Sequence, residues 1–230
     1  MIDSPERPSD GRSLQATWPG YVVPMFLFMA LTSAENSLPH VAIGLYVVKT
    51  VVVTVALLAF RAPWRDIRPE ARVLPMAILV GLVVFVEWIV VDPLTPHLGW
   101  LGGKRSALNP FADFSDPTMR VLFLAVRFYG LVLMVPVMEE LFWRSFLLRW
   151  LTHPDFQGLP IGDFSWSAFA IVAACFGLAH PEWLAAIVCA CAYGLLLRQT
   201  RSLFACIVAH GVTNLALGIY VLTTHTWQYW

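Results

Sequence analysis

Residues 133–143 read LMVPVMEELFW and place two adjacent glutamates, Glu139 and Glu140, inside an apolar run. An ionisable side chain at membrane depth costs several kcal/mol by most estimates, so such residues face a bundle interior or a water-filled cavity and usually mark function. The pair therefore predicts a membrane-embedded helix that carries part of an internal polar site.

The composition of the whole chain agrees with a membrane protein. Of its 230 residues, 58% are hydrophobic and only 13% are charged, whereas soluble domains carry about 25% charged residues. The formal net charge is +0 and the sequence pI is about 7.0, so no basic surface is available to attract nucleic acid. We therefore expect the lipid bilayer, and no nucleic acid, as a partner.

Apolar segments recur along the chain, and several reach the roughly 20 residues that cross a bilayer as a helix. They cover residues 21–31, 41–60, 73–91, 119–151, 166–180, 183–197 and 203–222. We predict an all-α fold, a polytopic transmembrane helical bundle of about seven hydrophobic helices. The fifth and sixth segments are short and are separated by His180-Pro181-Glu182, which predicts a hairpin that turns within the membrane.

The predicted domain organisation is simple. Residues 1–19 are polar and read as a flexible amino-terminal tail, and residues 20–230 form a single integral membrane domain whose motif-bearing part is 119–222. Segment 21–31 is followed by small residues, as in a secretory signal, but acidic residues in the preceding tail favour its retention as the first helix.

Basic residues in short loops predict the orientation, because cytoplasmic loops are enriched in Lys and Arg. Arginines cluster between the second and third segments and again between the sixth and seventh, so these loops and the amino terminus are expected in the cytoplasm. The carboxyl-terminal aromatics are expected at the opposite interface, where Lys104-Arg105 is an exception to the rule. The residues concerned are Arg61, Arg65, Arg68, Arg72, Arg198 and Arg201 inside, and Trp227, Tyr229 and Trp230 outside.

Three helices are expected to bring polar residues to a similar depth. At 1.5 Å per residue, Glu139 lies about 18 Å, His180 about 22 Å and His210 about 12 Å from the cytoplasmic helix ends. Accidental polar residues have no reason to agree in depth. We therefore predict that they meet in one site.

Helical spacing assigns partners within this site, since residues four apart share a face and adjacent residues diverge by about 100°. Glu140 can pair with Arg144, which leaves Glu139 pointing elsewhere. His210 and Asn214 are four apart, as are Phe176 and His180.

A carboxylate, two imidazoles and an amide can activate water and stabilise an oxyanion. They can equally hold a divalent metal such as zinc, with Glu140, His180 and His210 as candidate ligands. The common zinc-protease motif His-Glu-x-x-His is absent from the chain, so the sequence leaves both possibilities open.

Three motifs carry a resemblance to a known family: Glu139-Glu140-x-x-x-Arg144, Phe176-x-x-x-His180 and His210-x-x-x-Asn214, in this order on successive apolar segments. The pattern resembles the CAAX protease and bacteriocin-processing family of intramembrane endopeptidases, which includes the Ras-converting CAAX endopeptidase. Residues 139–150 and 209–230 further resemble the CAAX-protease-related branch found beside bacterial exosortase systems.

The resemblance implies roles for the motif residues. Glu139 would activate water with help from His180, and His210 and Asn214 would stabilise the tetrahedral oxyanion. Glu140, Arg144 and Phe176 would shape the site. The mechanism would be either metal-dependent or a metal-free glutamate mechanism.

The resemblance also implies a setting and a class of substrate. The substrate would be a membrane-associated peptide or lipidated protein. The exosortase-associated branch suggests a multi-pass protein of the bacterial inner membrane that acts as a component of such a system.

Two other classes of function fit the same residues. Buried carboxylates and imidazoles also serve proton- or metal-ion-coupled transporters, and a non-catalytic immunity or binding protein could keep the same fold. Further charges at Lys49, Glu87 and Arg127 predict either a structural ion-pair network or a substrate path.

Overall fold

The computed structural model of this protein describes residues 18–96 and 108–229. Over these residues the regular structure is helical, with no strand, which confirms the predicted all-α class. Almost all of the predicted tail, together with Lys104-Arg105 and Trp230, lies outside the described residues.

Two π-helical segments, η5 (Gly130–Met134) and η6 (Leu141–Leu147), join three helices into one long rod. With this rod counted once, the described residues contain the seven predicted hydrophobic helices, and their boundaries agree to within a few residues except that the first helix extends to Ser37. The helices are α2 (Pro19–Ser37), α3 (Ala42–Ala59), α4 (Leu74–Val91), the short α5 (Pro110–Asp113), α6 (Pro117–Tyr129), α7 (Val135–Glu140), α8 (Leu148–Thr152), α9 (Trp166–Leu178), α10 (Trp183–Thr200) and α11 (Leu203–Thr224).

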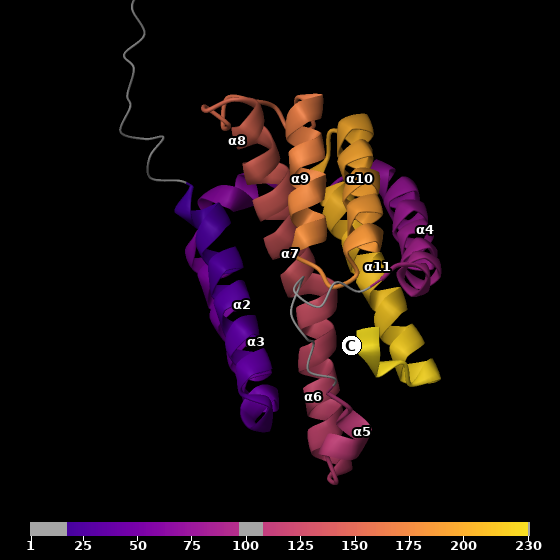
Figure 1. Cartoon of the computed structure of the whole chain (residues 1–230). Coiled ribbons are helices and arrows are strands. Elements are labelled where there is room, and N and C mark those ends of the chain that lie inside the picture. Colours follow the sequence, from indigo (N-terminus) through magenta and orange to yellow (C-terminus); the bar gives the residue numbers. More distant parts are fainter. Residues whose placement is uncertain (1–17, 97–107, 230) are drawn as a thin grey trace, which may run out of the picture.

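Five helical stretches of the described chain are long and apolar enough to cross a membrane, by length and composition: Pro39–Ala59, Ala71–Leu94, Pro117–Thr152, Trp183–Thr200 and Leu203–Thr224. Helix α9 is apolar but shorter. Figure 1 shows the turn between α9 and α10 beside the middle of the α6–α8 rod rather than at its end. This position agrees with the predicted hairpin that turns at membrane depth.

The rod stands between two groups of helices (Figure 1). Helices α2 and α3 pack together on one side, and α11 packs along α4 and contacts α10 on the other. Glycine permits the close approach of α4 and α11, because a Cβ at Gly81 would lie 2.5 Å from the carbonyl oxygen of Ala209. Thr213 of α11 also donates a hydrogen bond to the Gly81 carbonyl at 2.8 Å. Polar residues in the middle of the rod can thus be reached from both sides.

A carboxylate ties the loop between α3 and α4 to the rod. Asp66 Oδ2 accepts hydrogen bonds from Tyr21 at 2.8 Å and from Arg149 Nη2 at 2.7 Å, and also from the Ser145 hydroxyl. Because the Arg149 side chain is only 4% exposed, Asp66 is the carboxylate that balances its buried positive charge. Asp66 therefore holds the amino-terminal end of α2 against the end of the rod that follows the glutamates.

Asp66→Asn should lower the free energy of unfolding by about 2 kcal/mol, because hydrogen bonds to charged groups contribute about 1.5–3 kcal/mol. Unfolding of the purified protein in detergent measures the effect. Glu70→Gln is the control, since Glu70 pairs with an Arg72 side chain that is 80% exposed. An equal effect of both substitutions would show that Asp66 does not anchor the rod.

Candidate active site

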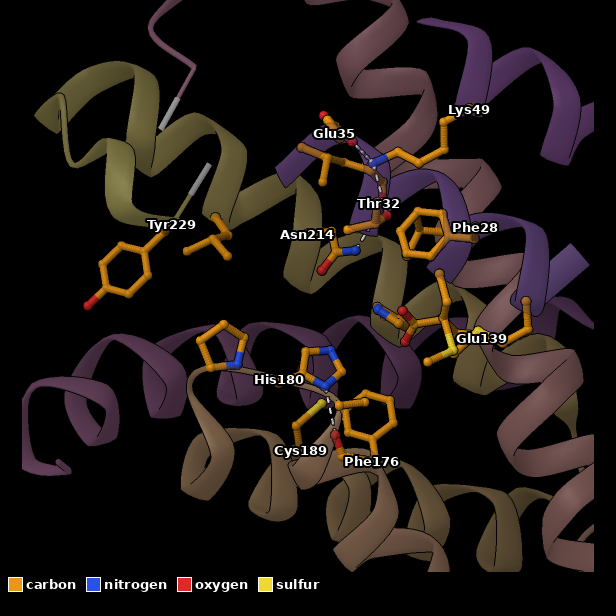
Figure 2. Close-up of a pocket in the computed structure, with 18 of the residues that line it drawn as sticks. Phe28, Thr32, Glu35, Lys49, Glu139, Phe176, His180, Cys189, Asn214 and Tyr229 are labelled. Carbon is orange, nitrogen blue, oxygen red and sulfur yellow. Dashed lines mark hydrogen bonds and ion pairs between the residues drawn. The ribbon is translucent and has the colours of Figure 1, made fainter. Parts of the chain in front are cut away.

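A cavity of about 660 Å³ lies inside the bundle, with walls from α2, α3, the rod, the α9–α10 hairpin and α11. Glu139, His180, His210 and Asn214, which the sequence analysis singled out, all line it. Figure 2 shows Glu139, His180 and Asn214 around a common space. The structure thus brings together four polar side chains from three separate parts of the chain.

Glu140 lies behind the cavity wall and forms the predicted pair with Arg144. Arg144 Nη1 donates to Glu140 Oε1 at 3.1 Å, and the two side chains are 1% and 0% exposed. The same oxygen accepts a hydrogen bond from His210 Nδ1 at 2.9 Å. Glu140 therefore links the arginine of its own helix to the histidine of α11, a contact that local spacing could not predict.

The hydrogen bond to Glu140 determines which nitrogen of the His210 ring carries a proton. A carboxylate only accepts, so Nδ1 must carry the proton. In the neutral imidazole Nε2 is then an acceptor, and the ring becomes a donor at Nε2 only when it is protonated.

His180 follows the end of α9 and is oriented by the helix that precedes it. Its Nδ1 donates to the Phe176 carbonyl oxygen at 2.7 Å, and its ring stacks on the Phe176 ring with centroids 4.5 Å apart. The Trp88 ring from α4 forms an edge contact with the His180 ring, with centroids 6.0 Å apart. Because the carbonyl accepts the Nδ1 proton, Nε2 of the neutral ring carries the lone pair that a general base needs.

Phe176 connects this histidine to the buried ion pair. Its ring is 1% exposed and has the Arg144 guanidinium over it, 4.7 Å from the centroid. A cation over an aromatic face is stabilised by the quadrupole of the ring. Arg144, Phe176 and His180 therefore form one stacked group.

Asn214 is held by an irregularity of the rod. In η5 the Val135 N–H bonds to the Gly130 carbonyl, which is the i→i−5 pattern of a π-helix. The next residue, Pro136, has no N–H to give to Leu131. Asn214 Nδ2 instead donates to the Leu131 carbonyl oxygen at 2.9 Å. This bond uses one amide hydrogen of Asn214 and leaves the side-chain oxygen and the second hydrogen at the cavity.

The opposite wall of the cavity contains a polar cluster that includes Lys49 and Arg127, which the sequence analysis named, and Glu35, which it did not. Lys49 of α3 forms an ion pair with Glu35 of α2 and donates to the Thr32 hydroxyl at 3.2 Å (Figure 2). Arg127 lines the same cavity, but Glu87, which was expected to form a network with Lys49 and Arg127, is not among its lining residues. The acidic partner of Lys49 is thus Glu35, which the sequence analysis did not consider because Glu35 lies beyond the apolar part of its helix, where the predicted segment had already ended.

Tyr229 also lies where the sequence did not place it. It was expected at the membrane interface as an aromatic anchor, but it is 7% exposed and lines the cavity. The chain turns back after α11, where His225 adopts a left-handed conformation with φ 59°. Hydrophobic burial thus places this aromatic residue inside the protein.

The described residues do not form a metal site of the kind considered from the sequence. Among them, no group of three or more His, Cys, Asp or Glu side chains is arranged to hold an ion. Glu140 Oε1 already accepts hydrogen bonds from Arg144 Nη1 at 3.1 Å and from His210 Nδ1 at 2.9 Å. The positive guanidinium therefore competes with a metal cation for this oxygen. Glu140, His180 and His210 therefore do not fit a shared metal in this arrangement.

The fold and the cavity define an integral membrane protein with an internal carboxylate and imidazole site. Residues 121–216 match the family model of type II CAAX prenyl endopeptidases, described as Rce1-like. The match includes all three motifs and confirms the predicted resemblance to the CAAX protease family, which supports an intramembrane protease. Searches of curated proteins and of solved structures found no match.

Proposed function

We propose that this protein is an endopeptidase that hydrolyses a peptide bond of a membrane-associated substrate with water activated by Glu139 and His180. The observation that carries the proposal is the presence of Glu139, His180, His210 and Asn214 around one cavity of about 660 Å³. Such a set supplies a base and oxyanion donors around one space inside the bundle.

The proposed first step is attack of water on the substrate carbonyl. Glu139 accepts the water proton as oxygen attacks carbon, and Nε2 of His180 accepts a hydrogen bond that orients the same water. Glu139 then returns the proton to the leaving amine, so that the carboxylate is regenerated. Carboxylates and imidazoles at hydrogen-bond distance from water are the usual groups for such transfers.

The proposed oxyanion site consists of His210 and Asn214. The second amide hydrogen of Asn214 and Nε2–H of a protonated His210 donate to the developing oxyanion. Glu140 holds the His210 ring in place through its 2.9 Å contact with Nδ1. The proposed role of Glu140 and Arg144 is therefore to position the His210 ring.

Asn214→Ala should lower kcat by about 10²-fold with little change in KM, because the removal of one oxyanion donor costs about 10²- to 10³-fold. Steady-state cleavage of a substrate by the purified protein measures the change. Thr223→Ala on the same helix is the control, since the Thr223 hydroxyl is bonded to backbone carbonyls of its own helix. An increase in KM alone would contradict the oxyanion role.

The cavity walls suggest how a membrane substrate is accommodated. Met25, Phe28 and Met29 of α2 line one side, and the part of α2 that follows them carries Thr32 and Glu35. An apolar wall next to polar groups suits a peptide that is partly buried in lipid. The proposed substrate class is therefore a membrane-associated peptide or lipidated protein, and the exosortase-associated resemblance favours a bacterial sorting-signal protein.

The proposed orientation places the arginine-rich end of the bundle and the amino terminus in the cytoplasm of a bacterial cell. The loops that contain Arg65 and Arg201 line a common cavity and therefore lie at the same end, as the positive-inside rule requires. Labelling of single cysteines in intact cells with an impermeant reagent tests this orientation, because a cysteine at Arg65 should react only after the membrane is opened.

The function is tested by comparing membrane peptides from cells that contain the wild-type protein with peptides from cells that contain Glu139→Gln. Mass spectrometry should identify new carboxyl termini only in the wild-type sample. Identical peptides in both samples, together with cation uptake that depends on Glu139 in proteoliposomes, would instead identify a transporter.

A further inference from the structure

A second cavity, of about 320 Å³, lies at the arginine-rich end of the bundle and is separate from the candidate active site. Three arginines line it: Arg65 and Arg68 from the loop between α3 and α4, and Arg201 from the turn between α10 and α11. Arg201 is far from Arg65 and Arg68 in sequence, so the fold brings the three charges around one space.

The acidic residues of this cavity are already neutralised by groups outside it. Asp66 accepts hydrogen bonds from Arg149 and Tyr21, and Glu70 pairs with Arg72. These three partners do not line the cavity.

The arginines are compensated less completely. Arg201 pairs with Asp163, whereas Arg65 and Arg68 have no carboxylate partner among the described residues. The cavity therefore has an excess of positive charge that an anion would balance.

The backbone adds to this positive potential. Helix α11, with 22 residues, begins at the cavity wall with Leu203, and Ser202 caps it by accepting a hydrogen bond from the Ala205 N–H. The amino-terminal end of a long helix carries a partial positive charge and exposes N–H groups. The helix end and the arginine side chains thus favour an anionic group in the same place.

Exposed tryptophans indicate that this end of the bundle lies at the membrane interface. Trp64, Trp150 and Trp166 are 39%, 49% and 57% exposed, and they lie next to the same helix ends as the arginine cavity. Tryptophan is enriched at the level of the lipid headgroups. The cavity is therefore expected at headgroup depth, where the phosphate groups of lipids are concentrated.

We propose that Arg65, Arg68 and Arg201 bind a phosphate group, and that this group belongs to an anionic membrane phospholipid. Basic pockets between transmembrane helices on the cytoplasmic side recognise such headgroups, and the arginine fork suits phosphate oxygens. The site lies outside the candidate active site, so a bound lipid would stabilise the contact of the two loops rather than take part in hydrolysis.

The test uses delipidated full-length protein in a non-ionic detergent, to which phosphatidylglycerol, phosphatidylcholine or inorganic phosphate is added. Native mass spectrometry counts the bound lipids, and the midpoint of thermal unfolding reports binding. Phosphatidylglycerol should bind and raise the midpoint more than phosphatidylcholine. The double variant Arg65→Gln/Arg68→Gln should bind it about 30-fold more weakly, at roughly fivefold per arginine near the membrane surface.

The double variant Arg61→Gln/Arg198→Gln is the matched control, because it removes the same number of charges from the same end of the bundle but from outside the cavity, and leaves the Glu70–Arg72 pair intact. It should retain wild-type affinity. Equal losses in both double variants, or equal binding of the two lipids, would overturn the proposal. Binding of inorganic phosphate alone, with the same dependence on Arg65 and Arg68, would uphold the phosphate site and reject the lipid as its source.

Discussion

Glu139→Gln is expected to lower kcat for peptide hydrolysis by about 10²- to 10⁴-fold, the usual contribution of a general base. Glutamine keeps the shape of the side chain but cannot accept the water proton, so KM and the unfolding midpoint should change little. The measurement is the rate of product formation by purified protein in detergent or proteoliposomes, with the unfolding midpoint recorded for the same preparations.

Glu87→Gln is the matched control for this prediction. Glu87 is another carboxyl group in an apolar helix, and its oxygens are buried, but it does not line the active-site cavity. It should retain wild-type kcat. Wild-type turnover by folded Glu139→Gln would remove Glu139 from the mechanism, and equal losses in both variants would point to a general need for charge in the bundle.

Arg144→Met is expected to lower the free energy of unfolding by about 3–5 kcal/mol, the cost of removing one partner from a buried ion pair. Arg144 is 1% exposed, and Glu140, its partner, is 0% exposed. Methionine fills much of the volume but leaves the Glu140 charge with only His210 to balance it. Chemical unfolding in detergent, followed by tryptophan fluorescence, measures the loss.

The double variant Glu140→Gln/Arg144→Met separates charge from packing. It removes both charges and should recover part of the stability lost in Arg144→Met, because no uncompensated carboxylate remains. Activity should stay low, because the double variant no longer orients His210 through a carboxylate. A loss below about 1 kcal/mol in Arg144→Met would match an exposed pair and would contradict the buried network.

The features that could be predicted from the sequence are those that depend on local spacing. Apolar segments give helices of predictable length, and a separation of four residues gives the Glu140–Arg144 pair and the contact of Phe176 with His180. The convergence of Glu139, His180 and His210 could also be expected, because helices that cross a membrane share a common reference for depth.

Contacts between distant segments could not be predicted in the same way. The hydrogen bond from Asn214 to Leu131 depends on the π-helical register of the rod. The pair of Glu35 with Lys49 depends on how far α2 extends. These contacts are set by packing between helices, for which a single sequence carries no spacing signal.

The position of Tyr229 has a similar origin. The sequence shows an aromatic cluster after the last helix, and such a cluster is typical of a membrane interface. The left-handed turn at His225 instead directs the chain back to the bundle, where Tyr229 is buried. A terminal aromatic residue can be buried either at the membrane interface or inside the bundle, and the direction of the turn decides between the two.

The central claim is that Glu139, His180, His210 and Asn214 face one water-accessible cavity. Single cysteines at these four positions, in a background where Cys175, Cys189, Cys191 and Cys206 are alanine, can be tested in proteoliposomes with a charged, water-soluble thiol reagent. All four should react much faster than Leu133→Cys, a position on the same rod whose leucine is 56% exposed on the outer surface of the bundle. Reaction at all four positions no faster than at Leu133→Cys would contradict the shared hydrated site.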